Sequence, residues 1–206
     1  MNSSKSAPSA PIIDGIVLSA GRSRRMGRPK ALLPVDGETF IERSIRVLIE
    51  GGCRLVVAVV GTDAEEISRR AEQSGAKVVV NPEPDSDQAT SLRCGLRALG
   101  PEAEAVVVLP VDHPLVSAKT VLLLLEAYRA ARAPIVRPVY RGVPGHPGVF
   151  ARRILPELLR EDLPEGAHTV IEAHRSEILD VDVNDAGVTA DIDSPDDYRR
   201  LVEGAC

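Results

Sequence analysis

The sequence predicts an α/β fold in which a mostly parallel sheet is covered by helices on both faces. Three observations favour this fold. Short apolar runs alternate with segments whose apolar residues recur at helical spacing. One run, residues 55–60, is apolar throughout, as expected for a strand that is buried on both faces. The 206 residues fit one domain with a sizeable core, and no linker or internal repeat divides them. We therefore expect a single-domain, Rossmann-like three-layer sandwich over residues 12–206.

The expected elements follow one another along the chain. The strands are expected at residues 12–18, 55–60, 77–80, 105–109, 135–139 and 178–183. The helices are expected at residues 40–50, 62–74, 88–99 and 117–131, in an interrupted stretch over 151–174, and in a short last helix after residue 194. Residues 141–148 are rich in Gly and Pro and are expected to form a loop.

Local signals mark the ends of several elements. Gly51 ends the first helix. Thr62 and Glu65 have the spacing of a capping box, which predicts that Thr62 caps the second helix. Ser194 is a suitable N-cap for the last helix, with Pro195 at its first position.

A basic loop follows the first strand directly, and residues 16–34 read IVLSAGRSRRMGRPKALLP. Small residues come first, and then five cations: Arg22, Arg24, Arg25, Arg28 and Lys30. Backbone N–H groups and clustered cations at the end of a strand suit a polyphosphate. The spacing of Gly21 and Gly27 fits neither a P-loop nor a dinucleotide fingerprint. A basic surface loop or a nucleic-acid patch remains the alternative.

The composition restricts the class of protein. The net charge is −5, from 25 basic and 30 acidic residues, and aromatic side chains are scarce. An acidic chain with one basic loop favours a local anion site over a general nucleic-acid surface. Residues 1–11 are rich in Ser, Ala and Pro and are expected to form a disordered tail, not a signal peptide. The cysteines, Cys53, Cys94 and Cys206, lack the spacing of zinc or redox motifs and suit a reducing compartment, so we expect a cytoplasmic protein.

Carboxylates after the later strands are candidates for a metal site. Asp112 follows an apolar strand, and the carboxyl ends of parallel strands meet at one edge of a sheet, so Asp112 should lie near Lys30. Asp191 and Asp193 alternate in a short extended segment and should share one face. A bound triphosphate normally carries Mg²⁺, which prefers oxygen ligands. Asp193 is the better candidate for a second metal contact. A turn residue at position 112, and plain helix-start acids near Ser194, are the alternatives.

Five motifs along residues 12–203 together resemble the MobA-like nucleotidyltransferases, and within them the molybdenum cofactor cytidylyltransferase branch. They are the loop quoted above, SLRCGL at 91–96, PVDHPL at 110–115, GHPGVF at 145–150 and DIDSPDD at 191–197. The first motif is specific, and the others are weak singly. The resemblance implies the nucleotide-diphospho-sugar transferase type of fold. It implies transfer of a nucleoside monophosphate from CTP, with Mg²⁺, to the phosphate of molybdopterin-bound molybdenum. It also implies handing-over of the product to a xanthine-dehydrogenase-like enzyme.

The resemblance also implies roles for individual residues. Lys30, Arg22 and Asp112 would be catalytic, and Asp112 and Asp193 would hold the metal. The nucleotide would contact Leu18, Ser19, Ala20, Gly21, Arg22, Ser23, Arg25, Met26, Gly27, Lys30 and Ser91. The acceptor would contact Gly145, His146 and Gly148. A simple N-cap is an equally fair interpretation of Ser91, and His146 has a structural or merely exposed alternative.

Two positions depart from the family pattern and leave the acceptor open. His113 stands where relatives often have Gln or Met, and Val111 where they often have a small residue. GTP as donor, a sugar 1-phosphate-like acceptor, and a non-catalytic protein that shelters a finished cofactor therefore stay as alternatives. His168 and His174 lie in a helical stretch, and we expect neither to take part.

Overall fold

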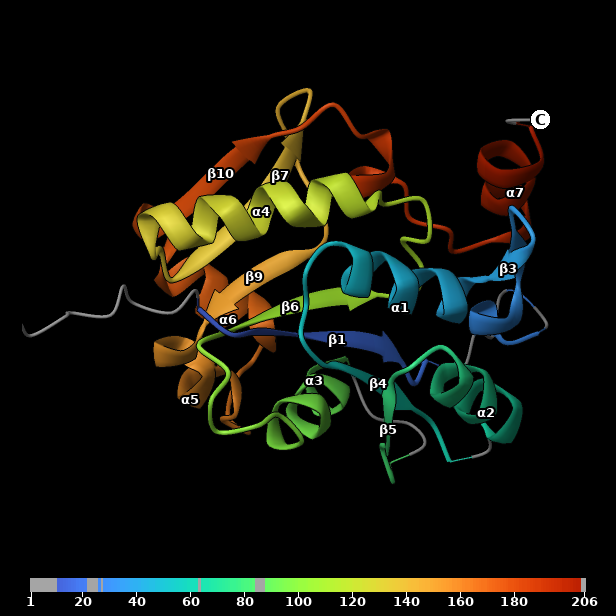
Figure 1. Ribbon diagram of the computed structural model, residues 1–206, viewed down its shortest axis with the longest axis horizontal. Coiled ribbons are helices and arrows are strands. Elements are labelled where there is room, and N and C mark those ends of the chain that lie inside the picture. The colour runs from blue at the N-terminus through green and yellow to red at the C-terminus, as the bar shows by residue number, and fades with distance from the viewer. Residues whose placement is uncertain (1–10, 22–25, 27, 63, 84–87, 205–206) are drawn as a thin grey trace, which may run out of the picture.

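A twisted central sheet runs through the computed structural model, which describes residues 11–21, 26, 28–62, 64–83 and 88–204 (Figure 1). Within these residues the strand order is β10–β7–β9–β6–β1–β4–β5, and β8 pairs with the last two residues of β7. The strands are β1 (Ile13–Ser19), β4 (Val56–Val60), β5 (Lys77–Val80), β6 (Ala105–Pro110), β7 (Ile135–Tyr140), β8 (Val143–Pro144), β9 (Gly148–Ala151) and β10 (Ile178–Asp182).

The sheet is mostly parallel, as the sequence predicts. The parallel pairs are β1 with β4 and β6, β4 with β5, and β7 with β10. The strand β9 runs antiparallel to both β6 and β7, and β8 runs antiparallel to β7. Because β1 and β6 are parallel neighbours in register, Leu18 lies beside Pro110, and both strands end at the same edge of the sheet.

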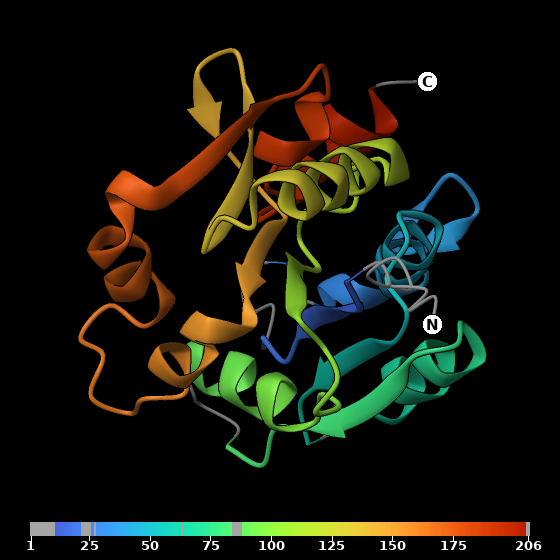
Figure 2. The same ribbon diagram turned by 60° about the vertical axis from the view of Figure 1, so that its left-hand side comes forward.

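Helices cover both faces of the sheet, which gives the three layers that the sequence predicts (Figures 1 and 2). The helices are α1 (Phe40–Glu50), α2 (Glu65–Gln73), α3 (Gln88–Arg97), α4 (Ala118–Ala131), α5 (Leu155–Leu158), α6 (Ala167–Ala173) and α7 (Pro195–Tyr198). Side chains of α1, α2 and α4 belong to one buried cluster, and those of α3, α5 and α6 to another. Along β1, Ile13 and Val17 enter the first cluster and Ile16 and Leu18 the second, because successive side chains of a strand point to opposite faces.

A close approach of α3 to the sheet explains one glycine of the sequence motifs. A Cβ atom at Gly95 would lie 2.9 Å from Cγ2 of Ile16 and 3.0 Å from Cγ2 of Val59. Any larger side chain at this position would push the helix away from β1 and β4. Gly95 thus sets how closely α3, which also carries Ser91, packs beside the end of β1.

Three local features differ from the sequence prediction. Strands β8 and β9 were not predicted, because β8 lies within residues 141–148, which were expected to form a loop, and β9 lies inside the sheet between that loop and the expected broken helix. The capping box of Thr62 and Glu65 is wrong, because α2 begins at Glu65 with Ala64 as N-cap and without a side-chain cap. A small hairpin of β2 (Pro34–Val35) and β3 (Glu38–Thr39) was not predicted, although Asp36-Gly37 is a typical hairpin turn.

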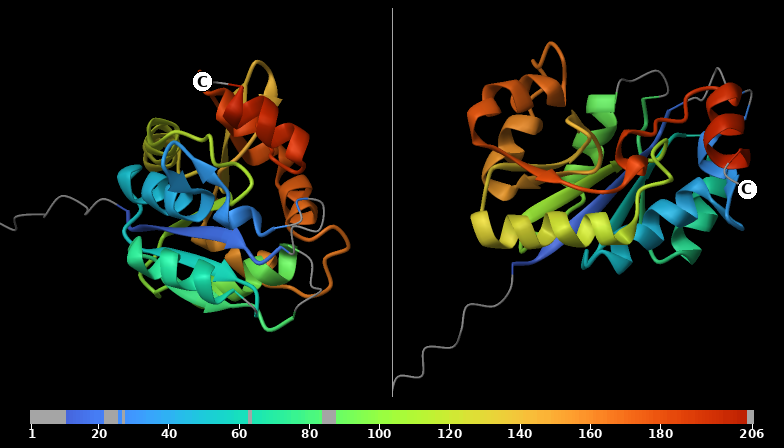
Figure 3. Two further views of the ribbon diagram at one scale, coloured as in Figure 1. Left: turned by 90° about the vertical axis from the view of Figure 1, so that its right-hand side faces the viewer. Right: turned by 90° about the horizontal axis from the view of Figure 1, so that it is seen from above.

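The C-terminal helix packs beside this hairpin, as Figure 3 shows. Its start is as predicted: the Ser194 hydroxyl accepts a hydrogen bond from Asp197 N, and Pro195 is the first helical residue. The Tyr198 hydroxyl donates to Pro34 O at 2.6 Å. The end of the chain is therefore tied to the segment that follows the basic loop. Among the residues described, no helix has the length and apolar character needed to cross a membrane.

Candidate functional site

The carboxyl ends of β1 and β6 bring Lys30 and Asp112 together. Val111 N donates to Leu18 O at 3.0 Å, which extends the pairing of the two strands by one step, and Asp112 comes next. Lys30 begins a 3₁₀ turn, η2 (Lys30–Leu32), at the end of the basic loop. Its Nζ atom lies 3.7 Å from Oδ2 of Asp112, and the lysine side chain is only 13% exposed. The expected meeting of the two residues is therefore observed.

A returning segment, residues 185–193, adds two more carboxylates to this place. Ile192 N donates to Asp112 O at 3.0 Å, and the Ile192 side chain is fully buried. The flanking Asp191 and Asp193 lie close enough for the charge of Asp193 to act on Asp191. Asp193 forms an ion pair with Lys30. Asp191 lies instead beside Asp112 and His113, where each residue offers a ligand atom within 4.8 Å of the others.

Negative charge accumulates at this site. Among the described residues, three carboxylates, Asp112, Asp191 and Asp193, lie near the ammonium group of Lys30. The pKa of Asp191 is raised, first by the partial burial of its carboxyl group and then by the negative charges of Asp112 and Asp193, while Lys30 acts in the opposite direction. The three acids therefore repel one another when ionised, and a further cation would relieve the repulsion.

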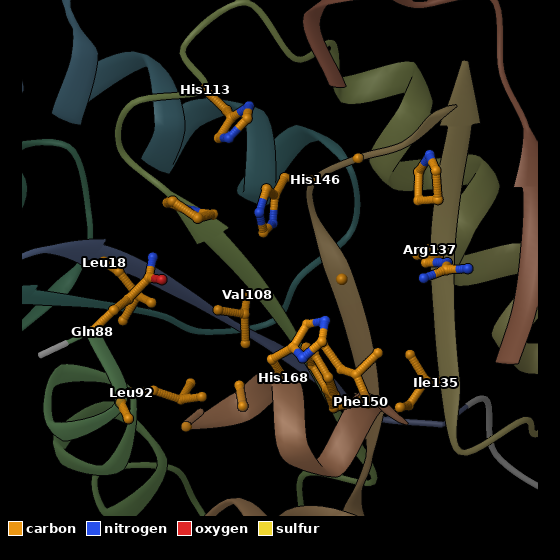
Figure 4. A pocket seen from close by; sticks show the side chains of 18 of the residues that line it. Leu18, Gln88, Leu92, Val108, His113, Ile135, Arg137, His146, Phe150 and His168 are labelled. Carbon is orange, nitrogen blue, oxygen red and sulfur yellow. The ribbon is translucent and has the colours of Figure 1, made fainter. Parts of the chain in front are cut away.

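Two histidines form one wall, and of these His113 is buried whereas His146 is exposed. The rings of His113 and His146 have centroids 4.6 Å apart and planes inclined by 51° (Figure 4). Burial lowers the pKa of His113 to about 4, so its imidazole is neutral at neutral pH. His146 N donates to Val188 O at 2.8 Å, which fixes the loop against the returning segment.

The donor set fits a divalent cation. Oδ1 of Asp112 and Nδ1 of His113 are both buried and have no hydrogen-bond partner within the described part of the chain. Buried polar atoms are normally paired, and a carboxylate oxygen and a neutral imidazole nitrogen are both common metal ligands. Orphaned ligand atoms beside an excess of negative charge are the features expected of a cation site.

A cavity of about 750 Å³ opens beside these groups. Figure 4 shows its apolar floor, which includes Leu92, Val108, Ile135 and Phe150. Polar groups line the rest, and they include Gln88, His113, Arg137, His146, Glu165, His168 and Asp191. A pocket with an apolar floor and a few convergent polar groups is typical of a small-molecule site.

The residues expected to bind a nucleotide lie around the end of β1. Leu18 and Ser19 are buried, Leu18 lines the cavity, and the Ser19 hydroxyl has no partner within the described residues. Ala20 and Gly21 follow the strand, and Met26 packs against the core. Arg22, Ser23, Arg25 and Gly27 lie outside the described residues. Ser91 is buried inside α3, three residues after its start, and accepts a hydrogen bond from Asn81 Nδ2 at 3.0 Å. The N-cap interpretation of Ser91 is therefore wrong.

The residues expected to bind the acceptor lie along the cavity wall. Gly145, His146 and Gly148 all line it. Gly145 also has a packing reason to be glycine, since a Cβ atom there would lie 2.2 Å from Val188 O. His168, which we expected to take no part, lines the cavity as well, whereas His174 is not among its lining residues. Sequence reasoning also missed the grouping of His113 with Asp112 and Asp191.

Comparison with known proteins places the chain in a family. Residues 15–178 match the MobA-like NTP transferase domain. The chain is 30% identical over 201 residues to nicotine blue oxidoreductase of Paenarthrobacter nicotinovorans, covering 93% of this chain and 97% of that protein. It is 26% identical over 200 residues to molybdenum cofactor cytidylyltransferase of Escherichia coli K12, covering 93% and 96%.

The fold is also similar to a solved structure. The crystal structure of Rv0371c from Mycobacterium tuberculosis H37Rv is 32% identical, with a TM-score of 0.83 over 95% of this chain and 99% of that one. Its complex with manganese superimposes with a TM-score of 0.78 at 30% identity, over 93% and 98% of the two chains. The sheet order, the basic loop after β1 and the match over most of the chain lead to one conclusion: this protein belongs to the MobA-like NTP transferase family of nucleotidyltransferases.

Proposed function

We propose that the chain transfers a cytidylyl group from CTP to the terminal phosphate of a molybdopterin-type cofactor and releases pyrophosphate. The observation that carries the proposal is the cluster of Lys30, Asp112 and Asp193 at the carboxyl ends of β1 and β6. A flexible ammonium group beside carboxylates and a basic loop suits a triphosphate that arrives with a cation. The 26% identity to the cytidylyltransferase of Escherichia coli supports CTP as the donor and molybdopterin as the acceptor.

The loop after β1 would hold the triphosphate. Backbone N–H groups of Ser19 to Gly21, together with Arg22 and Arg25, would face the phosphate oxygens. Lys30 would leave Asp193 and follow the negative charge onto the phosphates as the nucleotide binds. The nucleoside would lie toward α3, which carries Ser91.

The acceptor phosphate would attack the α-phosphorus of the nucleotide. One of its oxygens forms the new P–O bond, the bond to the bridging oxygen breaks, and pyrophosphate leaves with that electron pair. The phosphate monoester is already an anion near neutral pH, so the reaction needs no general base. Lys30 and the arginines would stabilise the charge that develops, and the walls of the site would align the two substrates.

Asp112 and Asp193 are the carboxylates that would hold Mg²⁺ in the complex with nucleotide. When bound, the cation would neutralise phosphate charge and orient the leaving group. The manganese complex of the similar Mycobacterium tuberculosis protein supports a divalent cation in this family.

The cavity would take the acceptor. Its volume of about 750 Å³ is in the range of small-molecule sites. Its apolar floor and the polar atoms of His146, His168 and Arg137 suit a flat ring system with polar edges. Handing-over of the product to a xanthine-dehydrogenase-like molybdoenzyme completes the proposal.

The test is pyrophosphate release from each of the four nucleoside triphosphates, with and without molybdopterin, followed by mass analysis of the product. We expect release with CTP that depends on the acceptor and yields the cytosine dinucleotide. Release with GTP, or with a sugar 1-phosphate in place of molybdopterin, would reassign the donor or the acceptor. Tight CTP binding with no release for any acceptor would favour a protein that shelters and delivers a finished cofactor.

A second candidate function comes from the relative with 30% identity, which is named for oxidation and reduction of nicotine blue. The cavity beside the neutral, buried imidazole of His113 is large enough for a flat dye-like molecule. The same purified protein, incubated with nicotine blue and NADH or NADPH, tests this candidate by loss of the dye's colour. The cluster of Lys30 with two carboxylates favours the transferase, because reduction of a dye has no need of a triphosphate and cation site.

A further inference from the structure

Three potential metal ligands of different chemistry meet at the end of β6. Asp112, His113 and Asp191 each offer one ligand atom, and these atoms lie within 4.8 Å of one another. Ligand atoms that share a cation at about 2.1 Å lie about 3 to 4 Å apart, so small side-chain movements suffice to bring all three onto one ion. The set contains a nitrogen ligand, which sets it apart from the purely carboxylate pair of Asp112 and Asp193.

Two of these residues have a buried polar atom without a hydrogen-bond partner in the described structure, although the His113 ring also forms a hydrogen bond with the backbone of Gly187. Nδ1 of His113 and Oδ1 of Asp112 are buried, and neither has a hydrogen-bond partner within the described residues. His113 as a whole is only 8% exposed, so bulk water does not satisfy its ring. The His146 ring packs against one side of His113 and restricts its rotation. An unpaired buried nitrogen held in one orientation beside carboxylates calls for a bound cation.

Among the described residues, Lys30 lies close to two of the three acids. Its ammonium group pairs with Asp193 and lies near Oδ2 of Asp112. Asp191 is grouped instead with Asp112 and His113, and Oδ1 of Asp112 has no hydrogen-bond partner among the described residues. The carboxylates of Asp112 and Asp191 thus lie next to the His113 imidazole.

We infer that His113, Asp112 and Asp191 together form a binding site for a first-row transition-metal ion, such as Mn²⁺ or Co²⁺, in the protein without nucleotide. Mg²⁺ prefers oxygen ligands and dehydrates reluctantly, whereas imidazole suits the later divalent ions. The site binds Co²⁺ more tightly than Mn²⁺, and both more tightly than Mg²⁺. This inference deepens the proposed function, because the ion concerned shares Asp112 with the cation that would serve nucleotidyl transfer.

The test measures metal binding to the full chain without nucleotide or acceptor. Electron paramagnetic resonance follows the titration of Mn²⁺, and electron-spin-echo modulation detects a nitrogen nucleus bonded directly to it. We expect one tightly bound Mn²⁺ with a directly coordinated nitrogen. Calorimetry with Co²⁺ and Mg²⁺ gives the order of affinity, with Mg²⁺ at least tenfold weaker than Co²⁺.

His113→Gln is the decisive variant, because the amide has similar length but offers oxygen in place of the imidazole nitrogen. It should lose the nitrogen signal and bind Co²⁺ at least tenfold more weakly, with Mg²⁺ affinity changed less than threefold. Asp191→Asn should weaken Mn²⁺ binding and keep the nitrogen signal. A thermal unfolding curve shows that each variant is folded.

His168→Ala is the matched control. This histidine is 60% exposed and lies 3.0 Å from Glu165, so it offers an imidazole beside a carboxylate outside the proposed site. Its removal should change neither the affinity nor the nitrogen signal. The inference is overturned if wild-type protein binds no Mn²⁺, shows no coupled nitrogen, or keeps that nitrogen in His113→Gln.

Pyrophosphate release with CTP and molybdopterin is measured separately on the same preparations. A nitrogen signal without release for any nucleotide or acceptor keeps the metal site and contradicts the proposed function. Release without a nitrogen signal keeps the function and contradicts the metal site.

Discussion

The Nζ atom of Lys30, which follows β1, lies 3.7 Å from Oδ2 of Asp112, which follows the neighbouring parallel strand β6. Lys30 is also paired with Asp193 of the returning segment. The lysine therefore joins the nucleotide loop to both carboxylates of the proposed cation pair. Because the ammonium group is largely buried among acids, its removal affects binding, reaction rate and the local charge balance together.

Replacement of Lys30 by alanine should abolish most of the transferase activity. The variant lacks the mobile cation that would follow charge onto the phosphates, so we expect kcat/KM for CTP to fall at least about 100-fold. Pyrophosphate release at saturating acceptor measures the loss. Lys119→Ala, at an exposed position in the first turn of α4, is the control and should keep wild-type activity. Wild-type turnover in Lys30→Ala would remove this residue from the proposed mechanism.

Asp112→Asn keeps the shape of the side chain and removes its charge. We expect activity to fall about 100-fold or more, because the amide is a poor ligand for the proposed cation. Stability should stay the same or rise, since Asp191 and Asp193 lose a neighbouring negative charge. Activity assays and urea unfolding on one preparation check the expected loss of activity and the expected stability. A variant that loses activity only because it unfolds would contradict the assigned role.

The sequence predicted the part of the site that depends on neighbouring strands. The apolar runs before Ser19 and before Asp112 identify buried strands, and parallel strands end at a common edge, so the meeting of Lys30 with Asp112 follows from local pattern.

The grouping of His113 with Asp191 could not be predicted in this way. It depends on the return of residues 185–193 to the end of β6, through contacts such as that of Ile192 N with Asp112 O. Pairings between residues so far apart in the chain leave no periodic signal. The strand β9 was missed for a related reason: four residues at the end of a Gly/Pro-rich loop are too few to show a periodicity.

Asp185 positions the segment that carries Asp191 and Asp193. Its Oδ2 accepts hydrogen bonds from Ser117 N and Ser117 Oγ, both at 2.9 Å, and from Thr120 Oγ1 at 2.5 Å. Asp185→Ala leaves these donors at the start of α4 without the Asp185 carboxylate. We therefore expect the free energy of unfolding to fall by about 1–3 kcal/mol. Urea unfolding measures the change.

The matched control for that substitution is Asp162→Ala, whose carboxylate pairs with Arg160 and is 71% exposed. An exposed ion pair contributes about 0–1 kcal/mol, so its loss should have a much smaller effect. Transferase activity should fall in Asp185→Ala and stay near wild type in the control. Equal stability of the two variants would contradict the positioning role of Asp185.

His174 should make stability depend on pH in the range where histidine titrates. Its Nδ1 lies 3.0 Å from Glu177 and its Nε2 3.1 Å from Glu157, and the hydrogen bonds with Glu177 and then Glu157 raise its pKa above 6.5. A raised pKa in the folded state means that the protonated form stabilises the fold. This contribution is fully present below the unfolded pKa of about 6.5 and is lost as the pH rises through the folded pKa.

His174→Gln should therefore destabilise the protein at pH 5.5 more than at pH 8.5. The ring is partly exposed, so we expect the difference between the two pH values to be about 0.5 kcal/mol. Urea unfolding of wild type and variant at both pH values measures it, and His168→Gln, at an exposed ring, serves as control. A larger effect at pH 8.5 would have the wrong sign and would show that the neutral ring, not the imidazolium, is the form that the two glutamates stabilise.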